Sequence, residues 1–305
     1  MDRQRAGVIT GLAAYVTWGL LTLFWKQLHR FNAFELIGWR ICSSAIIMVI
    51  IVPVTRRWAG VLPVFGNRRL FVRVLLAALM LAGNWTSYVW AVVHDRVLET
   101  ALGYFISPLF TVLLGVFVLK EVLHTAQVVA LGFAAVAVVV LTVSYGQVPW
   151  IAIGLAVSWT AYGWLKRDVP LGPAESMTAE SLVLIVPAVV AALALSGRAD
   201  SIPQSASGKE LTFAILTGLA TVTPLMMFAF AAKRVPLTII GPMLYIVPSI
   251  NFLLGWLVFH EALPPSRVLG FALVWVGLII LFVDSARRAH GTRGTTRLSG
   301  GPFAQ

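Results

Sequence analysis

The sequence predicts an all-α polytopic membrane protein with ten transmembrane helices arranged as two inverted five-helix repeats. Three observations predict it: the composition, the number of apolar segments and an internal repeat. Of the 305 residues, 59% are hydrophobic and only 11% are charged, whereas a soluble domain carries about 25% charged residues. So few charges cannot cover the surface of a soluble protein of this size, which excludes a soluble fold.

Ten apolar segments follow one another along the chain, each close to the roughly 20 residues that a helix needs to cross a bilayer. Backbone groups that face lipid must bond within their own segment, so we expect these segments to be helices. A barrel would require apolar–polar alternation, which is not visible. The segments are Val8–Trp25, Ala33–Val54, Phe71–Val93, Thr100–Leu119, Ala126–Ser144, Val148–Leu165, Ala179–Leu195, Leu211–Ala232, Thr238–Phe259 and Val268–Val283.

The net charge of +11 indicates how the chain is oriented in the membrane. With ten spans and the N-terminus inside, most Lys and Arg residues, among them Arg56, Arg68 and Lys233, fall in inside loops. Because basic loops stay in the cytoplasm, we expect a protein of the plasma (inner) membrane with both termini cytoplasmic. This bias explains the basic excess without a nucleic acid partner. Residues 286–305 are basic, Gly-rich and unpatterned, which predicts a disordered cytoplasmic tail.

Two stretches of the chain resemble each other at a constant spacing. ALGYFISPLFTVLLGVFVLKEVL, from Ala101, aligns without a gap with GPMLYIVPSINFLLGWLVFHEAL, from Gly241, at an offset of 140 residues. Eight of 23 positions are identical, and a shared Pro, Gly and Glu frame is harder to obtain by chance than shared aliphatic residues. The same offset relates Pro108 to Pro248, Gly115 to Gly255, Glu121 to Glu261, Glu35 to Glu175 and Lys26 to Lys166.

The offset spans five segments, and five is odd, so the second copy enters the membrane from the opposite side. This predicts two inverted repeats, residues 1–145 and 146–285, followed by the tail. Inverted repeats are the architecture of many secondary transporters, with the substrate site at the repeat interface near the membrane midplane. The alternative is a gene duplication that was kept only for packing.

Several stretches resemble a known family. They are NWTSYVWAV (Asn84–Val92), LGYFISPLFTVLLG (Leu102–Gly115), VPWIAIGLAVSWTAYGWLK (Val148–Lys166) and TPLMMFAFAAKRVPLTIIGPMLYIVPSINFLLG (Thr223–Gly255). They look like the RarD group of EamA-type transporters, in the drug/metabolite transporter superfamily, and the likeness runs from the first helix to the tenth. The resemblance implies an inner-membrane carrier of small metabolites or drugs with ten helices. The traditional label of the group, "chloramphenicol-sensitive protein", does not establish a substrate.

Two symmetry-related prolines stand near the centres of their spans. Pro108 and Pro248 each remove a backbone donor and free the carbonyl one turn earlier, and carriers use such breaks to bind substrate and to bend. We interpret both as helix breaks for gating, with a passive kink as the alternative. Pro224 is a third candidate break, but its symmetry-related position is occupied by Asn84.

Aromatic residues lie inside the spans as well as at their ends. Buried Tyr and Trp need partners for their O–H and N–H groups, and a cavity that they line suits a flat or cationic organic substrate. Core packing is the alternative for each of them. The candidate substrate contacts are Trp18, Tyr88, Tyr104, Trp159, Tyr162 and Tyr245. The residues interpreted as interface anchors, near span ends, are Trp25, Trp58, Trp150 and Trp164.

Arg40 is the most informative single residue, because it lies several residues inside the second span. A guanidinium in a membrane usually marks function, and this one could bind a substrate carboxylate or phosphate; snorkelling to the outer interface is the alternative. Glu180 occupies the position related to Arg40 by the offset of 140 residues. It is a candidate proton carrier, with an acidic residue in the first turn of its helix as the alternative.

Four further polar residues belong to the same spans or to their ends. Asn84 and Asn251 are candidate substrate contacts, and hydrogen bonding between helices is the alternative that we favour. Glu121 and Glu261 each follow a span by one turn, where a helix cap, a gate or a loop tie is expected rather than contact with substrate.

These observations favour a secondary active transporter that works by alternating access, coupled to protons or to the substrate gradient. The chain contains no P-loop, which argues against ATP hydrolysis, and no G-x-S-x-G, H-E-x-x-H or Cys/His cluster, which argues against a membrane-embedded enzyme. A channel or scaffold without alternating access is the other alternative. We expect no cofactor and no metal. The expected partners are a small-molecule substrate and the lipid bilayer, and no feature selects between a monomer and a homodimer.

Overall fold

The computed structural model describes residues 3–54, 58–118, 120, 122–236, 239–240 and 243–298, and every regular element in these ranges is helical. The all-α class predicted from the sequence is therefore confirmed. The chain divides into two compact units. The first contains Met1–Tyr104 and Trp150–Ala262, and the second contains Phe105–Pro149 and Leu263–Gln305.

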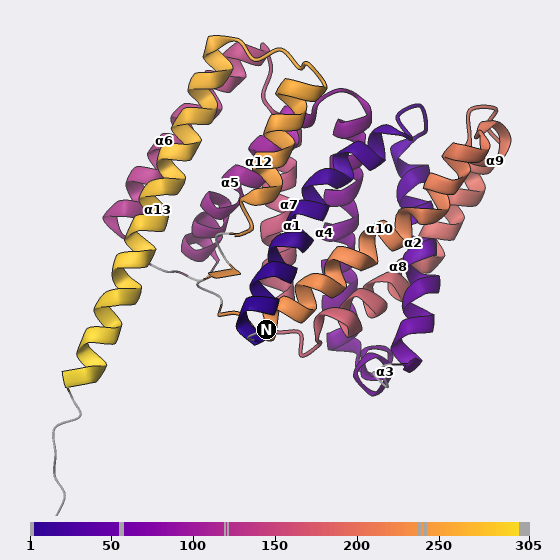
Figure 1. Ribbon diagram of the computed structural model, residues 1–305, viewed down its shortest axis with the longest axis horizontal. Coiled ribbons are helices and arrows are strands. Elements are labelled where there is room, and N and C mark those ends of the chain that lie inside the picture. Colours follow the sequence, from indigo (N-terminus) through magenta and orange to yellow (C-terminus); the bar gives the residue numbers. More distant parts are fainter. Residues whose placement is uncertain are drawn as a thin grey trace, which may run out of the picture. The chain divides into compact units, whose positions relative to one another are not determined.

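The first unit holds most of the helices (Figure 1). Its helices are α1 (Arg3–Lys26), α2 (Ala33–Val54), α3 (Trp58–Gly66), α4 (Arg68–Val93), the start of α5 (Val97–Phe117), α7 (Trp150–Lys166), α8 (Pro173–Ser196), α9 (Ile202–Ser205), α10 (Gly208–Ala232) and α12 (Ile246–Leu253), which continues as the π-helix η1 (Leu254–Val258). The second unit contains the rest of α5 with α6 (Thr125–Tyr145) and α13 (Pro265–Leu298).

Eight helices are long and apolar enough to cross a membrane, namely α1, α2, α4, α5, α6, α8, α10 and α13. Two of the ten predicted segments fall short of this length. The sixth is α7, with 17 residues, and the ninth forms the shorter apolar helix Ile246–Val258. Pro236 and Pro248 limit how far a helix can extend there, because a proline offers no N–H to a helical hydrogen bond. The count of ten spanning helices stays a prediction.

The three candidate helix breaks differ in their surroundings. Pro248 lies in the first turn of α12, where an N–H has no partner within the helix, so its absence there frees no carbonyl. The described helix is interrupted by a turn at residues 244–245, just before Pro248, and the role of Pro248 in gating stays a prediction. Pro108 and Pro224 do lie inside helices, and α5 and α10 continue on both sides of them.

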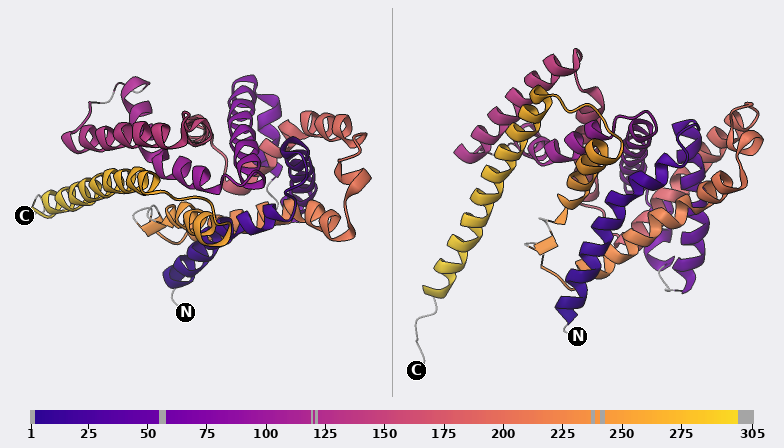
Figure 2. Two further views of the ribbon diagram at one scale, coloured as in Figure 1. Left: turned by 90° about the horizontal axis from the view of Figure 1, so that it is seen from above. Right: turned by 45° about the horizontal axis from the view of Figure 1, so that its top comes forward.

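Helices from the two halves of the sequence pack against each other in both units. In the first unit, α1 packs on α10, α2 packs on α8 and on α10, and α4 packs on α7. In the second unit, α6 packs along α13 (Figure 1). The two views of Figure 2 show α1, in indigo, against α10, in orange. Each compact unit therefore contains helices from before and after residue 145, and the two repeats, residues 1–145 and 146–285, stay a prediction.

Two glycines permit close helix packing in the first unit. A Cβ atom added to Gly218 of α10 would lie 2.5 Å from the backbone carbonyl carbon of Ser43 on α2. A Cβ atom added to Gly103 of α5 would lie 2.9 Å from the carbonyl oxygen of Ala152 on α7. Neither position has room for a side chain, so the backbones themselves are in contact. The contact at Gly218 holds α10 against α2 three residues from Arg40, which also lies on α2.

Three helical stretches depart from the expected loops and tail. The short helices α3 and α9 lie between spans where the apolar pattern predicts only loops. The last helix, α13, continues to Leu298, although a disordered tail is predicted from residue 286. A helix that has already formed in an apolar segment extends at little cost, because the unfavourable step is nucleation. Residues 299–305 lie outside the described part of the chain.

Candidate functional site

Arg40 lies inside the first unit, on α2, with 6% of its surface exposed. Its guanidinium carbon is 3.6 Å from the ring centroid of Trp85 and 5.6 Å from that of Trp25. Its Nε atom is buried and has no hydrogen-bond partner among the described residues. Snorkelling to water is therefore not what this side chain does. It is a buried cation held against aromatic rings, and such an arrangement is costly unless something else pairs with it.

Tyr88 begins a chain of hydrogen bonds beside Arg40. Its hydroxyl is 2.7 Å from the Thr22 hydroxyl, which in turn donates to Asn251 Oδ1 at 2.8 Å. Asn251 Nδ2 donates to the Thr100 hydroxyl at 3.4 Å. All four residues are buried, and they come from α4, α1, α12 and α5. The chain therefore ties four helices together around the aromatic surroundings of Arg40.

Asn84 forms a second tie, between α4, α5 and α7. Its Nδ2 donates to the Leu155 carbonyl at 3.0 Å and to the Ser158 hydroxyl at 2.9 Å. Its Oδ1 accepts a hydrogen bond of 2.9 Å from the Tyr104 hydroxyl. Both ends of the amide are thus satisfied by protein groups. This geometry supports the role between helices that the sequence favoured, and the same holds for Asn251.

Aromatic rings continue from this point toward a buried carboxylate. The rings of Tyr88 and Tyr104 are 6.0 Å apart, those of Tyr104 and Trp159 are 6.1 Å apart, and those of Trp159 and Tyr162 are 5.8 Å apart. The Tyr162 hydroxyl lies 3.4 Å from both carboxylate oxygens of Glu180. Four of the six predicted aromatic contacts therefore form one continuous row.

Glu180 has a complete set of partners at the end of that row. Its Oε1 lies 2.7 Å from Lys166 Nζ and accepts a hydrogen bond of 2.9 Å from the Ser176 hydroxyl. Lys166 also donates to the Ser176 hydroxyl. Because α8 begins at Pro173, Glu180 lies beyond its first turn, where Glu175 is the acidic residue. The explanation of Glu180 as a first-turn acid is therefore wrong, and its ion pair with Lys166 explains its burial.

The remaining predicted contacts lie elsewhere in the first unit. Trp18 packs against Tyr15 and Phe228, with ring centroids 5.5 Å and 5.9 Å away. Tyr245 precedes α12 and is half-buried. Neither makes a described contact with the row of rings that leads to Glu180. Glu121, the predicted counterpart of Glu261, lies outside the described residues.

Three residues next to the site were missed or misread in the sequence. Trp25, expected at the interface, is only 1% exposed and lies beneath Arg40. Trp85 stacks on the guanidinium of Arg40. It belongs to the motif NWTSY, but it is not among the candidate site residues predicted from the sequence. Lys166, the last residue of α7, pairs with Glu180. The pairing of Lys26 with Lys166 by the repeat was a signal that this lysine has a fixed place.

Glu261 caps the beginning of α5. Its carboxylate accepts hydrogen bonds from the backbone N–H groups of Val97 and Leu98, the latter at 2.9 Å. Burial raises the pKa of the Glu261 carboxyl, while the two N–H donors favour its ionised form. This contact joins the residues after η1 to α5 and fits the cap or loop tie expected for this position.

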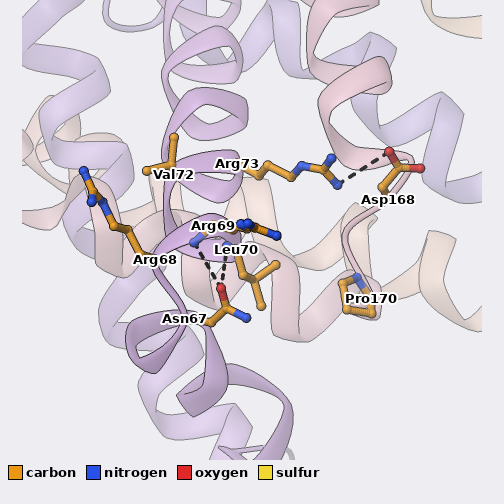
Figure 3. A pocket seen from close by; sticks show the side chains of 8 residues that line it. All are labelled: Asn67, Arg68, Arg69, Leu70, Val72, Arg73, Asp168 and Pro170. Carbon is orange, nitrogen blue, oxygen red and sulfur yellow. Dashed lines mark hydrogen bonds and ion pairs between the residues drawn. The ribbon is translucent and has the colours of Figure 1, made fainter.

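The first unit also contains a hollow of about 770 Å³, away from the residues described so far. It lies at the start of α4, where Asn67 accepts hydrogen bonds from the backbone of Arg69 and Leu70 (Figure 3). Arg73 extends toward Asp168, at 3.5 Å, while Arg68 points the other way. With three arginines and one aspartate in its wall, the hollow is positively charged. Within the described residues, no group of three or more His, Cys, Asp or Glu could hold a metal ion.

Comparison with known proteins identifies the family. The model of the EamA-like transporter family matches residues 5–143 and again residues 148–283. The chain belongs to the EamA-like transporter family. It is a multi-pass membrane protein of this family with two copies of the EamA domain, and a transporter function agrees with the apolar helices.

Several relatives of this EamA-family protein are similar over nearly their full length. "Protein RarD" from Streptomyces exfoliatus is 40% identical over 292 residues, which cover 96% of this chain and 93% of the relative. "Uncharacterized transporter YojE" from Bacillus subtilis is 34% identical, with 90% and 93% covered. "Chloramphenicol-sensitive protein RarD" from Pseudomonas aeruginosa is 26% identical, with 94% and 98% covered.

The fold of this EamA-family chain also occurs in a solved crystal structure. The two superpose with a TM-score of 0.58 at 20% sequence identity, and the match covers 94% of this chain and 100% of the other. At this identity the likeness concerns the fold alone.

Proposed function

We propose that the protein is a secondary active transporter of the inner membrane, which moves a small organic molecule by alternating access. In this proposal ten helices span the membrane as two inverted repeats, and both termini are cytoplasmic. The substrate site surrounds Arg40. The observation that carries the proposal is the buried guanidinium of Arg40, whose Nε has no hydrogen-bond partner among the described residues, on a helix that packs against α8 and α10 of the second half.

The packing pairs support a two-fold relation between the halves. If the halves are exchanged in chain order, α1 replaces α7, α2 replaces α8, α4 replaces α10, and α6 replaces α13. The pair α1–α10 then becomes α7–α4, and both pairs are in contact. The pairs α2–α8 and α6–α13 map onto themselves. The short helices correspond as well, because α3 follows α2 and α9 follows α8. A duplication with this symmetry is the framework that alternating access uses.

The pair of Lys166 and Glu180 supports proton coupling as part of the proposal. Buried carboxylates with ionisable partners form proton relays in many carriers. Here Glu180 contacts Lys166, Ser176 and Tyr162, and the row of rings leads from Tyr162 back to Tyr104 and Tyr88. A change in the protonation of Glu180 would therefore act on residues that pack next to the Arg40 site.

Cysteine accessibility tests alternating access without any knowledge of the substrate. In a Cys42→Ser background, Ser158→Cys places a thiol beside Asn84, and Val97→Cys with Glu261→Cys places two thiols at the cap of α5. We expect a membrane-impermeant maleimide to reach residue 158 from either side of the membrane. Once the pair at 97 and 261 is oxidised, labelling should continue from the cytoplasm and stop from outside.

Other outcomes of this experiment would point to the alternatives. Labelling from both sides that is unaffected by oxidation of the pair would indicate a channel, and no labelling from either side would indicate a scaffold. Single cysteines at the exposed residues Gly66 and Gly208 serve as topology controls. They should label from the cytoplasm and from outside, respectively, and the reverse pattern would overturn the orientation.

A further inference from the structure

The surroundings of Arg40 define the class of molecule that this site accepts. We infer that the substrate is an organic anion, with a carboxylate or a similar acidic group that pairs with Arg40 and a planar part that packs among the neighbouring rings. This inference rests on the proposed transport function and deepens it. Aromatic linings in general suit flat or cationic ligands. For this site the inference keeps the flat ligand and excludes the cationic one.

The unpaired charge is the first step of the inference. Arg40 is 6% exposed, its Nε has no hydrogen-bond partner in the described part of the chain, and none of the ion pairs found there includes it. A guanidinium keeps its proton throughout the physiological pH range, so the charge cannot be removed by titration. A buried cation without a partner is costly, and a transient anion is the partner that would remove this cost during transport.

The stacking geometry shows which atoms of Arg40 are free to bind. Trp85 covers one face of the guanidinium, with 3.6 Å between its ring centroid and the guanidinium carbon. A stacked guanidinium still has the N–H groups at its edge, which point within its plane. These groups form a fork that matches the two oxygens of a carboxylate. The contact with Trp85 therefore orients the fork without occupying it.

The same contacts argue against a cationic substrate. The ring faces nearest to the charge, those of Trp85 and Trp25, already contact Arg40. A second cation placed among these rings would therefore meet a like charge in a region of low dielectric, where repulsion is strong.

The residues around the arginine favour a planar group next to the anion. Tyr88, Tyr104 and Trp159 form the row of rings that begins beside Arg40. Tyr and Trp rings pack well against other flat rings, in stacked or edge-on contacts.

A second positive feature of the same unit agrees with an anion, because the hollow at the start of α4 is lined by three arginines and one aspartate. Such a surface raises the local concentration of anions.

A series of probes that share a phenyl ring and carry end groups of different charge tests the inference. Purified protein in detergent is titrated with phenylacetate, phenylacetamide and phenethylamine, which are anionic, neutral and cationic at neutral pH, and thermal unfolding is followed. We expect phenylacetate to raise the unfolding midpoint most, because a ligand that binds the folded state stabilises it. Cyclohexylacetate, an anion without a flat ring, should stabilise less than phenylacetate.

Variants of Arg40 assign the effect to this residue. Arg40→Gln should weaken phenylacetate binding by about 10- to 100-fold, which is the range for a charge-assisted hydrogen bond. Arg40→Lys should restore part of the affinity, because the charge is kept and the fork is lost. Arg234→Gln is the matched control, because Arg234 also stacks on a ring, Phe230 at 3.5 Å, but is exposed. It should bind like the unchanged protein.

Several results would overturn the inference and leave the transport proposal standing. Stronger stabilisation by phenethylamine than by phenylacetate is one. No stabilisation by either carboxylate at about 10 mM, where even millimolar binding is visible, is another. Unchanged phenylacetate binding in Arg40→Gln is a third. The charge series on the unchanged protein decides the matter even if the Arg40 variants fail to fold. Failure of transport itself would instead appear in the cysteine labelling, which needs no ligand.

Discussion

Two buried charges in the same compact unit have opposite surroundings. Glu180 is 4% exposed and meets a lysine, a serine and a tyrosine, whereas Arg40 is 6% exposed and meets aromatic rings. The two charges are separated by the offset of 140 residues that relates the similar stretches of the sequence. The difference indicates a division of roles: one position carries a charge that the protein neutralises itself, and the other keeps a charge available for a partner from outside.

The first way to test this contrast is to remove the partner of Glu180. Lys166→Met should lower the free energy of unfolding by about 3 kcal/mol, because it leaves a buried carboxylate without its cation. Unfolding in detergent, with a double-mutant cycle that includes Glu180→Gln, measures the coupling. A loss below about 0.5 kcal/mol would place this pair among exposed ion pairs, and the contrast with Arg40 would disappear.

Tyr104 lies between the two charges and tests the hydrogen bonds that connect them. Tyr104→Phe removes the donor to the buried Oδ1 atom of Asn84, so we expect a loss of about 1 to 2 kcal/mol in unfolding free energy. Tyr88→Phe is the control with a smaller expected loss, because Thr22 keeps its contacts with Asn251 and with the Gly19 carbonyl. Equal losses in the two variants would contradict this assignment.

Arg40 itself should behave in the opposite way to Lys166. In the absence of ligand, Arg40→Gln should raise the unfolding free energy by about 1 kcal/mol, since a costly unpaired charge is removed. The measurement is the same detergent unfolding assay, with Arg234→Gln as the control. A loss as large as that of Lys166→Met would show that Arg40 stabilises the protein and does not wait for a ligand.

An exposed ion pair provides the baseline for these effects. Arg73 and Asp168 are 3.5 Å apart, and each side chain is about half exposed. Arg73→Gln should change the unfolding free energy by less than about 0.5 kcal/mol, because water screens such pairs. A larger change would mean that charge removal alone perturbs the unit, and the values for Lys166 and Arg40 would then have to be corrected for it.

The sequence predicted what depends on composition and periodicity. The all-α class and most of the apolar helices follow from segments that must satisfy their backbone groups internally. It also singled out Arg40, Tyr88, Tyr104 and Asn84, because polar and aromatic residues are conspicuous inside apolar segments. Tyr88, Tyr104 and Asn84 contact one another in the first unit, and Trp85 of the same helix α4 stacks on Arg40.

The sequence could not predict contacts that depend on how helices cross. Trp25 lies at the end of its span, where an interface anchor is the usual role, and only its packing beneath Arg40 shows otherwise. Lys166 ends α7 in the same way, and its carboxylate partner is 14 residues away on α8. The exact start of α12 at Ile246, two residues before Pro248, is likewise not resolved by the apolar pattern.

The contact at Gly218 has a mechanical consequence. At this point the backbones of α10 and α2 are in direct contact, and no side chain lies between them. The two helices therefore cannot move closer together there. On α2 the contact is at Ser43, three residues after Arg40. A tilt of α10 toward α2 would therefore displace the part of α2 that carries Arg40.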